Sequence, residues 1–222
     1  MIQRFLLVLL TALTSVAMTA PAWGQTTKPR AAVEVNLKAK LKAAESNPQQ
    51  LATLLKAGAK VASFCANCHG DGGNSVKPDV PNLAGQNESY LFDQLRNYSD
   101  GHRPTTEFKR RLINYLSVDE KVSMVAFYAR QEVAAHPPGD PAVTTRGRLL
   151  YKKFCADCHE NDGKGSEDYG RVAGQQPDYM MTALKSYRGN PTPRFSKDMV
   201  ASLKEMKDDD LKALVVYITS MK

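Results

Sequence analysis

The sequence contains one pentapeptide pattern, C-x-x-C-H, twice, at residues 65–69 and 155–159. Two thiols at this spacing lie on one helical turn, and the pattern is typical of covalent attachment of a c-type haem. The thiols add to the two vinyl groups of one haem, and the adjacent histidine reaches the iron as its proximal ligand. Because the chain has four cysteines, the two motifs use every thiol. The sequence therefore predicts two covalently bound haem c groups.

The residues expected to hold the haems are the motif side chains themselves. The predicted attachment points and proximal ligands are Cys65, Cys68 and His69 for the first haem, and Cys155, Cys158 and His159 for the second. The alternative is a zinc-binding or redox-active site, in which the four thiols, or thiols with the motif histidines, act together. Two copies of the motif, each followed by the same downstream pattern, favour haem.

The amino terminus has the features of a secretory signal. An apolar stretch from Phe5 to Ala20 follows a basic region with Arg4, and residues 22–24 place small residues where a signal peptidase reads the chain. We expect cleavage before Gln25 and not a retained anchor, because hydroxyl side chains interrupt a short apolar run. The sequence therefore predicts a periplasmic protein, in the compartment where bacteria attach c-type haem.

The second half of the chain repeats the first at an offset of 90 residues, from His69 to His159. Downstream of each motif, Leu-Ala-Gly-Gln at 83–86 is matched by Val-Ala-Gly-Gln at 172–175. Such self-similarity indicates two copies of one supersecondary unit. The expected organisation is a signal peptide at 1–24, an extension at 25–46 that could be helical, a first domain at 47–135, a proline-rich linker at 136–143 and a second domain at 144–222.

Each unit is predicted to be mainly helical. Asn47-Pro48 is expected to open the first helix of one unit, and Thr144 or Thr145 to cap the first helix of the other. Middle helices are expected over 88–98 and 177–187. The last helix of the first unit should begin with a capping box at 117–120, and three aspartates at 208–210 should begin its partner.

The sequence resembles the cytochrome c4 family of dihaem electron carriers. The resemblance covers about residues 48–222 and is carried by both C-x-x-C-H motifs and by the segments at 83–86, 90–95, 172–175 and 187–189. It implies an all-α fold of two tandem cytochrome c-like domains, each wrapped around one haem. It also implies a distal methionine on each iron and the transfer of single electrons.

The two units differ at the position where the resemblance places the distal ligand. Met199 lies 40 residues after His159 and fits this position. The first unit has Lys109 there, and it has no methionine between its motif and Met124, which is expected to pack in the core. Three alternatives stay open for the first haem: Lys109 as a neutral amine, His102, and water or a labile residue.

The resemblance also implies residues around the haems. Pro81 matches the family position whose carbonyl accepts a hydrogen bond from the proximal histidine, and Gly170 takes its place in the second unit. Arg103 and Arg171 are expected to meet haem propionates.

Two classes of function remain. An electron carrier is favoured over an enzyme, because the sequence shows no set of residues typical of a general base or of a substrate-binding site. Its expected partners are redox proteins: a bc-type complex, a dehydrogenase or a terminal oxidase. Peripheral association with the membrane surface is compatible with this function, and the formal charge of +7 gives no reason to expect nucleic-acid binding. The alternative is a dihaem enzyme or the electron-accepting subunit of a dehydrogenase, for example for thiosulfate or sulfide, which an unusual ligand near Lys109 would suit.

Overall fold

The computed structural model describes residues 30–189 and 196–222. The expected signal peptide at 1–24 and its cleavage site before Gln25 lie outside the described residues. Within them the chain forms helices and connecting loops and no strand, which confirms the all-α fold class. None of these described helices combines the length and the apolar character needed to cross a membrane.

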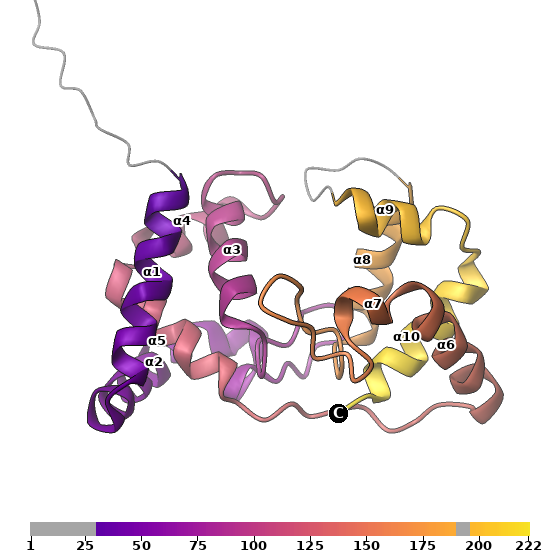
Figure 1. Cartoon of the computed structure of the whole chain (residues 1–222), viewed down its shortest axis with the longest axis horizontal. Coiled ribbons are helices and arrows are strands. Elements are labelled where there is room, and N and C mark those ends of the chain that lie inside the picture. The colour runs from indigo at the N-terminus through magenta and orange to yellow at the C-terminus, as the bar shows by residue number, and fades with distance from the viewer. Residues whose placement is uncertain (1–29, 190–195) are drawn as a thin grey trace, which may run out of the picture.

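Two lobes lie side by side, and each contains one C-x-x-C-H motif (Figure 1). The helices of the first lobe are α1 (Arg30–Glu45), α2 (Pro48–His69), the short 3-10 helix η1 (Asp71–Gly73), α3 (Glu88–Ser99), α4 (Glu107–Tyr115) and α5 (Val118–Ala129). The helices of the second lobe are α6 (Pro141–Phe154), α7 (Ala156–His159), α8 (Pro177–Gly189), α9 (Lys197–Leu203) and α10 (Asp208–Ser220). The repeat in the sequence is therefore a repeat of the fold, in which α3, α4 and α5 correspond to α8, α9 and α10.

Helix α2 of the first lobe and helix α6 of the second each begin at a proline that follows a side-chain cap. Asn47 accepts hydrogen bonds from two backbone N–H groups in the first turn of α2, as the sequence predicts. In the second lobe the cap is Asp140, which accepts two equivalent hydrogen bonds. The expectation of a cap at Thr144 or Thr145 is wrong, because Asp140 and Pro141 already provide the cap and the first helical position. Helix α6 thus begins inside the stretch expected to be the linker.

The last helix of each lobe begins where an acidic side chain accepts a hydrogen bond from a backbone N–H group of the N-cap residue. Ser117 Oγ accepts from the N–H of Glu120 at 3.2 Å, and the Glu120 carboxylate accepts from the N–H of Ser117 at 2.8 Å. This confirms the predicted capping box. At the start of α10, the Asp210 carboxylate accepts from the N–H of Lys207 at 3.0 Å. Both helices therefore start at the residues that the sequence indicates.

Helix α2 crosses α5, and helix α6 crosses α10, at a glycine in each case. A Cβ atom built on Gly58 of α2 would lie 2.0 Å from the carbonyl oxygen of Ser123 in α5. A Cβ atom on Gly147 of α6 would lie 2.0 Å from the carbonyl oxygen of Ala213 in α10. No side chain fits at either distance, so the close approach of the two helices requires glycine. The crossings fix the positions where α2 and α6 end, and with them the positions of the two C-x-x-C-H motifs.

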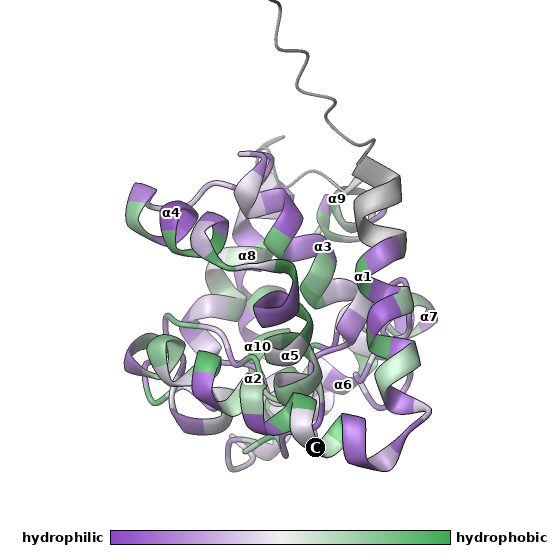
Figure 2. Ribbon diagram, turned by 90° about the vertical axis from the view of Figure 1, so that its left-hand side faces the viewer, coloured by the Kyte–Doolittle hydropathy of each residue, from purple (hydrophilic) through white to green (hydrophobic). Residues whose placement is uncertain are grey.

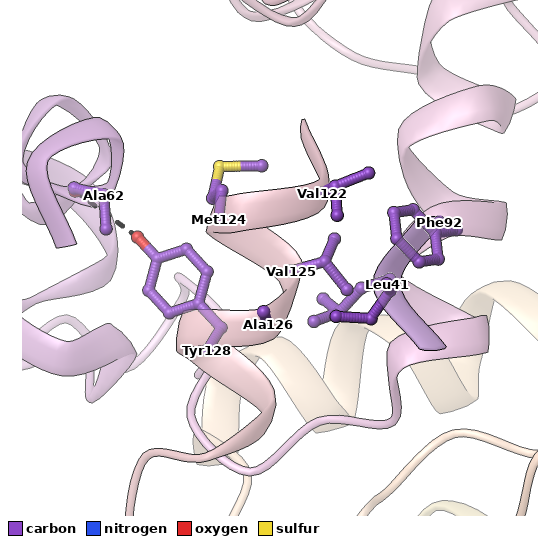
Figure 3. Close-up of a cluster of buried hydrophobic side chains, with 9 residues drawn as sticks. Leu41, Ala62, Phe92, Val122, Met124, Val125, Ala126 and Tyr128 are labelled. Carbon is purple, nitrogen blue, oxygen red and sulfur yellow. Dashed lines mark hydrogen bonds between the residues drawn. The ribbon is translucent and has the colours of Figure 1, made fainter. Parts of the chain in front are cut away.

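A large aromatic side chain fills the space beside each crossing, but it comes from opposite helices in the two lobes. In the first lobe Tyr128 of α5 is fully buried and lies beside Ala62 of α2, to whose carbonyl its hydroxyl donates (Figure 3). In the second lobe Tyr151 of α6 is fully buried and Ile218 occupies the position that matches Tyr128. A buried tyrosine therefore fills this part of the core in both lobes, from opposite helices of the crossing.

Helix α1 belongs to the core of the first lobe and has no counterpart in the second. Its Leu41 is only 2% exposed and packs with Phe92 of α3 and Val125 of α5 (Figure 3). At the end of α1, Glu45 pairs with Arg130, which also pairs with Glu88 at 2.7 Å. The extension is therefore held to the first lobe by both apolar packing and ion pairs.

Two glutamines join the lobes by equivalent hydrogen bonds. The side chain of Gln86 accepts from the backbone N–H of Arg171 at 2.7 Å and donates to its carbonyl at 2.9 Å. The side chain of Gln175 accepts from the N–H of Asn82 at 2.7 Å and donates to its carbonyl at 3.0 Å. These pairs occupy matching positions in the repeat, so the contact has approximate two-fold symmetry. It brings together the two loops that follow the C-x-x-C-H motifs.

Candidate haem sites

Both motif histidines are oriented by a backbone carbonyl. The Nδ1 atom of His69 lies 2.8 Å from the carbonyl oxygen of Pro81, and that of His159 lies 2.8 Å from the carbonyl oxygen of Gly170. Because a carbonyl can only accept, Nδ1 carries the proton and Nε2 has the free lone pair. The structure thus places Pro81 and Gly170 where the sequence expected them, and it leaves Nε2 of each ring available to a metal ion.

Burial keeps both imidazoles neutral. It lowers the pKa of His69 to about 4, against the opposing effect of the hydrogen bond to Pro81, and the positive charge of Lys109 lowers it further. Burial also lowers the pKa of His159. A neutral imidazole is the form that ligates iron.

The loop that carries Gly170 packs tightly against the first lobe. A Cβ atom at Gly170 would lie 2.8 Å from the ring of Tyr90 in α3. On the other side of the interface, the N–H of Tyr179 donates to the carbonyl of Pro78 at 2.9 Å. Glycine at 170 is therefore required by the contact between lobes, while its carbonyl still serves the proximal histidine.

The four motif cysteines lie in two separate pairs. Cys65 and Cys68 belong to the last turns of α2, whereas Cys155 precedes α7 and Cys158 lies within it. Burial raises the pKa of Cys65, and it raises the pKa of Cys155 to about 12. Among the residues placed by the structure, no group of three or more histidine, cysteine and acidic side chains could hold a metal ion. The arrangement thus differs from the single cluster that the zinc alternative requires.

One cavity of about 700 Å³ reaches both sites. All four motif cysteines and both motif histidines line it, together with apolar side chains of both lobes, among them Leu91, Leu95, Ile113, Val125, Met180 and Leu184. Its volume is in the range of about 300–1,000 Å³ that is usual for cofactor pockets. Thiols for attachment, a free Nε2 atom in each lobe and an apolar lining are what covalent haem needs, so the residues present fit two haem c groups.

Met199 lies on the side of the cavity provided by α9. The N-cap residue of this helix, Ser196, accepts a hydrogen bond at 3.4 Å from the backbone N–H of Met199. The methionine is half-buried and lines the cavity.

In the first lobe the corresponding helix is α4, which carries both hydrophilic and hydrophobic residues (Figure 2). Its Lys109 lines the cavity, and its Nζ atom lies 4.1 Å from the centroid of the Tyr98 ring. Burial, assisted by the charge of Arg103, lowers the pKa of Lys109 to about 8. The side chain of His102 is exposed and is not part of the cavity lining.

The two arginines expected near propionates both line the cavity. Arg103 is buried and donates to the hydroxyl of Tyr179, in the other lobe, at 3.0 Å. Arg171 donates through Nε to the carbonyl of Ala173 at 3.1 Å. Sequence reasoning did not identify the role of the glutamines or tyrosines at the interface, although the repeated Ala-Gly-Gln segments were a signal for the glutamines.

This fold and these sites define a c-type cytochrome with two haem-binding domains. Residues 55–135 and 144–222 each match the cytochrome c family. Cytochrome c4 of Pseudomonas aeruginosa is 30% identical over 177 residues, which cover 74% of this chain and 87% of that relative. The crystal structure of reduced cytochrome c4 from Pseudomonas stutzeri superposes with a TM-score of 0.66 at 26% identity, covering 75% of this chain and 98% of that one.

The chain therefore belongs to the cytochrome c family and, within it, to the cytochrome c4 group of dihaem electron carriers. It carries two covalent haem c groups, one at each C-x-x-C-H motif. A further relative is the thiosulfate dehydrogenase electron acceptor of Thiomonas intermedia, which is 27% identical over 139 residues, covering 57% of this chain and 64% of that protein.

Proposed function

We propose that the protein is exported to the periplasm and carries single electrons from a bc-type complex or a dehydrogenase to a terminal oxidase. The observation that carries the proposal is the single cavity lined by both sets of haem-binding residues. Haem iron supplies reversible one-electron chemistry when it is bound. Two such centres in adjoining parts of one cavity suit a protein that receives an electron on one lobe and delivers it from the other.

The residues of this chain provide attachment, ligation and exclusion of water. In this proposal His69 and His159 bind the two irons through Nε2, Met199 is the distal ligand of the second haem, and Arg103 and Arg171 meet propionates. The Pro81 and Gly170 carbonyls support this assignment, because each fixes the protonated nitrogen of its histidine.

The proposal is tested by rapid mixing of the purified holoprotein with a bc-type complex and, separately, with a terminal oxidase. We expect fast reduction by the first and fast oxidation by the second, both slowed by salt if charged surfaces guide docking. Failure of both reactions under conditions where another soluble cytochrome reacts would refute it.

Export is tested by fractionating bacteria that express the full chain. The basic and apolar pattern of residues 4–20 supports a cleaved signal. We expect the haem-containing protein in the periplasmic fraction with Gln25 at its amino terminus. Recovery of haem-containing protein with an intact amino terminus from the membrane fraction would contradict cleavage.

A second candidate is an electron acceptor for thiosulfate oxidation. It is favoured by the resemblance to the Thiomonas protein and by the lysine at the distal position of the first lobe. In this case thiosulfate and a thiosulfate dehydrogenase together should reduce the protein, and thiosulfate alone should not. Reduction by thiosulfate alone with formation of an oxidised sulfur product would instead indicate an enzyme.

A further inference from the structure

Lys109 occupies the same structural position as Met199. Each is the third residue of the short helix before the last helix of its lobe. In both cases the backbone N–H donates to the hydroxyl of the N-cap residue, from Lys109 to Thr106 at 3.2 Å and from Met199 to Ser196 at 3.4 Å. The equivalence therefore rests on matching hydrogen bonds as well as on sequence spacing, and it places both side chains on the same side of their haem sites.

The amine of Lys109 is held within the cavity. Its Nζ atom lies 4.1 Å from the centroid of the Tyr98 ring, which also lines the cavity. The same cavity is lined by Cys65, Cys68 and His69 of this lobe. Within the first lobe, Lys109 and His69 therefore line one cavity.

We propose that Lys109 Nζ is the sixth ligand of the iron in the first lobe, so that the two haems differ in ligation, His69/Lys109 in one and His159/Met199 in the other. A neutral amine has the lone pair that ligation of iron requires. The assignment rests on the haem groups at the two motifs and does not depend on the identity of the redox partners.

Other candidate ligands fit the structure less well. His102 is exposed and does not line the cavity. Met124 lines the cavity, but it belongs to α5 and packs in the core cluster of the first lobe (Figure 3). Its counterpart on α10 is Leu214, which the second lobe has in addition to Met199. The position of Met124 is therefore a core position in the repeat, and the ligand position is that of Lys109.

Unlike ligands give the two lobes different tasks. A thioether stabilises ferrous iron and raises the reduction potential, whereas an amine is a stronger donor to ferric iron. The haem of the first lobe should therefore have the lower potential, and an electron that enters there should pass to the second lobe. Two identical His/Met haems would give electron transfer between the lobes no preferred direction.

The test is spectroscopy of the ferric holoprotein, by electron paramagnetic resonance and near-infrared magnetic circular dichroism. We expect one haem with the sulfur-to-iron charge-transfer band of His/Met ligation and one low-spin haem ligated by two nitrogens. Lys109→Met should double the intensity of the charge-transfer band. Lys109→Ala should remove the signal of the haem that is ligated by two nitrogens, and it should leave the signal of the His/Met haem unchanged.

Control variants distinguish ligation by Lys109 from ligation by the other candidate residues. Arg110→Ala removes a neighbouring positive charge that does not line the cavity, and it should leave both spectra unchanged, as should His102→Ala and Met124→Leu. Two His/Met haems in the unsubstituted protein would overturn the proposal. So would a nitrogen signal that survives Lys109→Ala but is lost in His102→Ala.

Haem content distinguishes failure of the ligand assignment from failure of the haem assignment. We expect two haems per chain in every variant, because none alters a motif cysteine or histidine. Two haems per chain with unchanged spectra in Lys109→Ala would refute the lysine ligand alone. Fewer than two haems in the unsubstituted protein would refute the dihaem carrier itself.

Discussion

Glu160 follows the second proximal histidine with a backbone conformation that side chains rarely adopt. Its φ is 62°, and the matching residue of the first lobe is Gly70, with φ 75°. A non-glycine residue in this region costs on the order of 1–3 kcal/mol. The hydroxyl of Tyr151 donates to the Glu160 carbonyl at 2.7 Å and helps to hold the strained turn. The turn matters because it sets the direction in which the chain leaves the haem site.

Replacing Glu160 with glycine should therefore stabilise the second lobe. We expect Glu160→Gly to raise its free energy of unfolding by about 1 kcal/mol, because the relief of strain exceeds the entropy cost of glycine. The measurement is urea unfolding of the holoprotein followed by circular dichroism. Asn161→Gly, at a neighbouring position without positive φ, is the control and should bring no gain. A lower urea midpoint for Glu160→Gly would show that this turn is not strained.

Much of the site was predictable at the residue scale, because short-range patterns define it. The C-x-x-C-H motifs are found by spacing along the sequence. The role of the Pro81 carbonyl followed from the resemblance to the cytochrome c4 family, and so did the position of Met199, whose role as a ligand stays a prediction. The sequence showed that Lys109 stands at the position that corresponds to Met199. It did not decide between Lys109 and His102 as the ligand of the first haem. That choice depends on which side chain the fold turns into the cavity, and spacing alone does not encode this.

At the scale of single helices, the sequence located elements that begin with strong local signals. Asn47-Pro48 and the Ser117 capping box were found because caps act within a few residues. The start of α6 was misplaced, since Asp140 and Pro141 were taken as part of the linker. The helix crossings at Gly58 and Gly147 could not be foreseen, because a glycine within a helical pattern does not reveal what approaches it.

The helix crossings give a direct prediction. Gly58→Ala and Gly147→Ala should each destabilise their own lobe by about 1–3 kcal/mol, although alanine is the better helix former. The added methyl group would meet a backbone carbonyl oxygen at 2.0 Å, and a backbone atom cannot turn away as a side chain can. Thermal unfolding of the holoprotein measures the effect. Gly189→Ala, which meets nothing within 4 Å, is the control, and equal stability of all three variants would contradict the proposed crossing.

Helix α1 should contribute mainly to the stability of the first lobe. Leu41→Ala removes a fully buried side chain from the core and should cost about 2–5 kcal/mol. Lys42→Ala, at an exposed position of the same helix, should have little effect. Urea unfolding monitored separately at the two haems is the measurement. A Leu41→Ala variant as stable as the unsubstituted protein would mean that α1 does not pack as described.

On the scale of the whole molecule, the reciprocal glutamines hold the lobes in one arrangement. Gln86→Ala and Gln175→Ala would each leave a backbone N–H and a carbonyl without their partner in the interface, at about 1–3 kcal/mol for each buried group. We expect the double variant to unfold as two independent lobes and to have a larger radius of gyration by small-angle X-ray scattering. Gln49→Ala, at an exposed position, is the control.

An unchanged radius of gyration and a single unfolding transition in the double variant would contradict this role of the glutamines. Sequence patterns could not have predicted the interface in detail. The paired residues are 85 to 93 positions apart, and a repeat shows that two units match without showing how they face one another.

The most direct test of a carrier with two unlike haems is a reductive titration of the purified holoprotein, followed by the visible haem bands. We expect uptake of two electrons per chain in two resolved steps, in which the haem with the sulfur-to-iron band is reduced first. Uptake of one electron per chain, or two electrons in one step at a single potential, would contradict a carrier with two unlike haems.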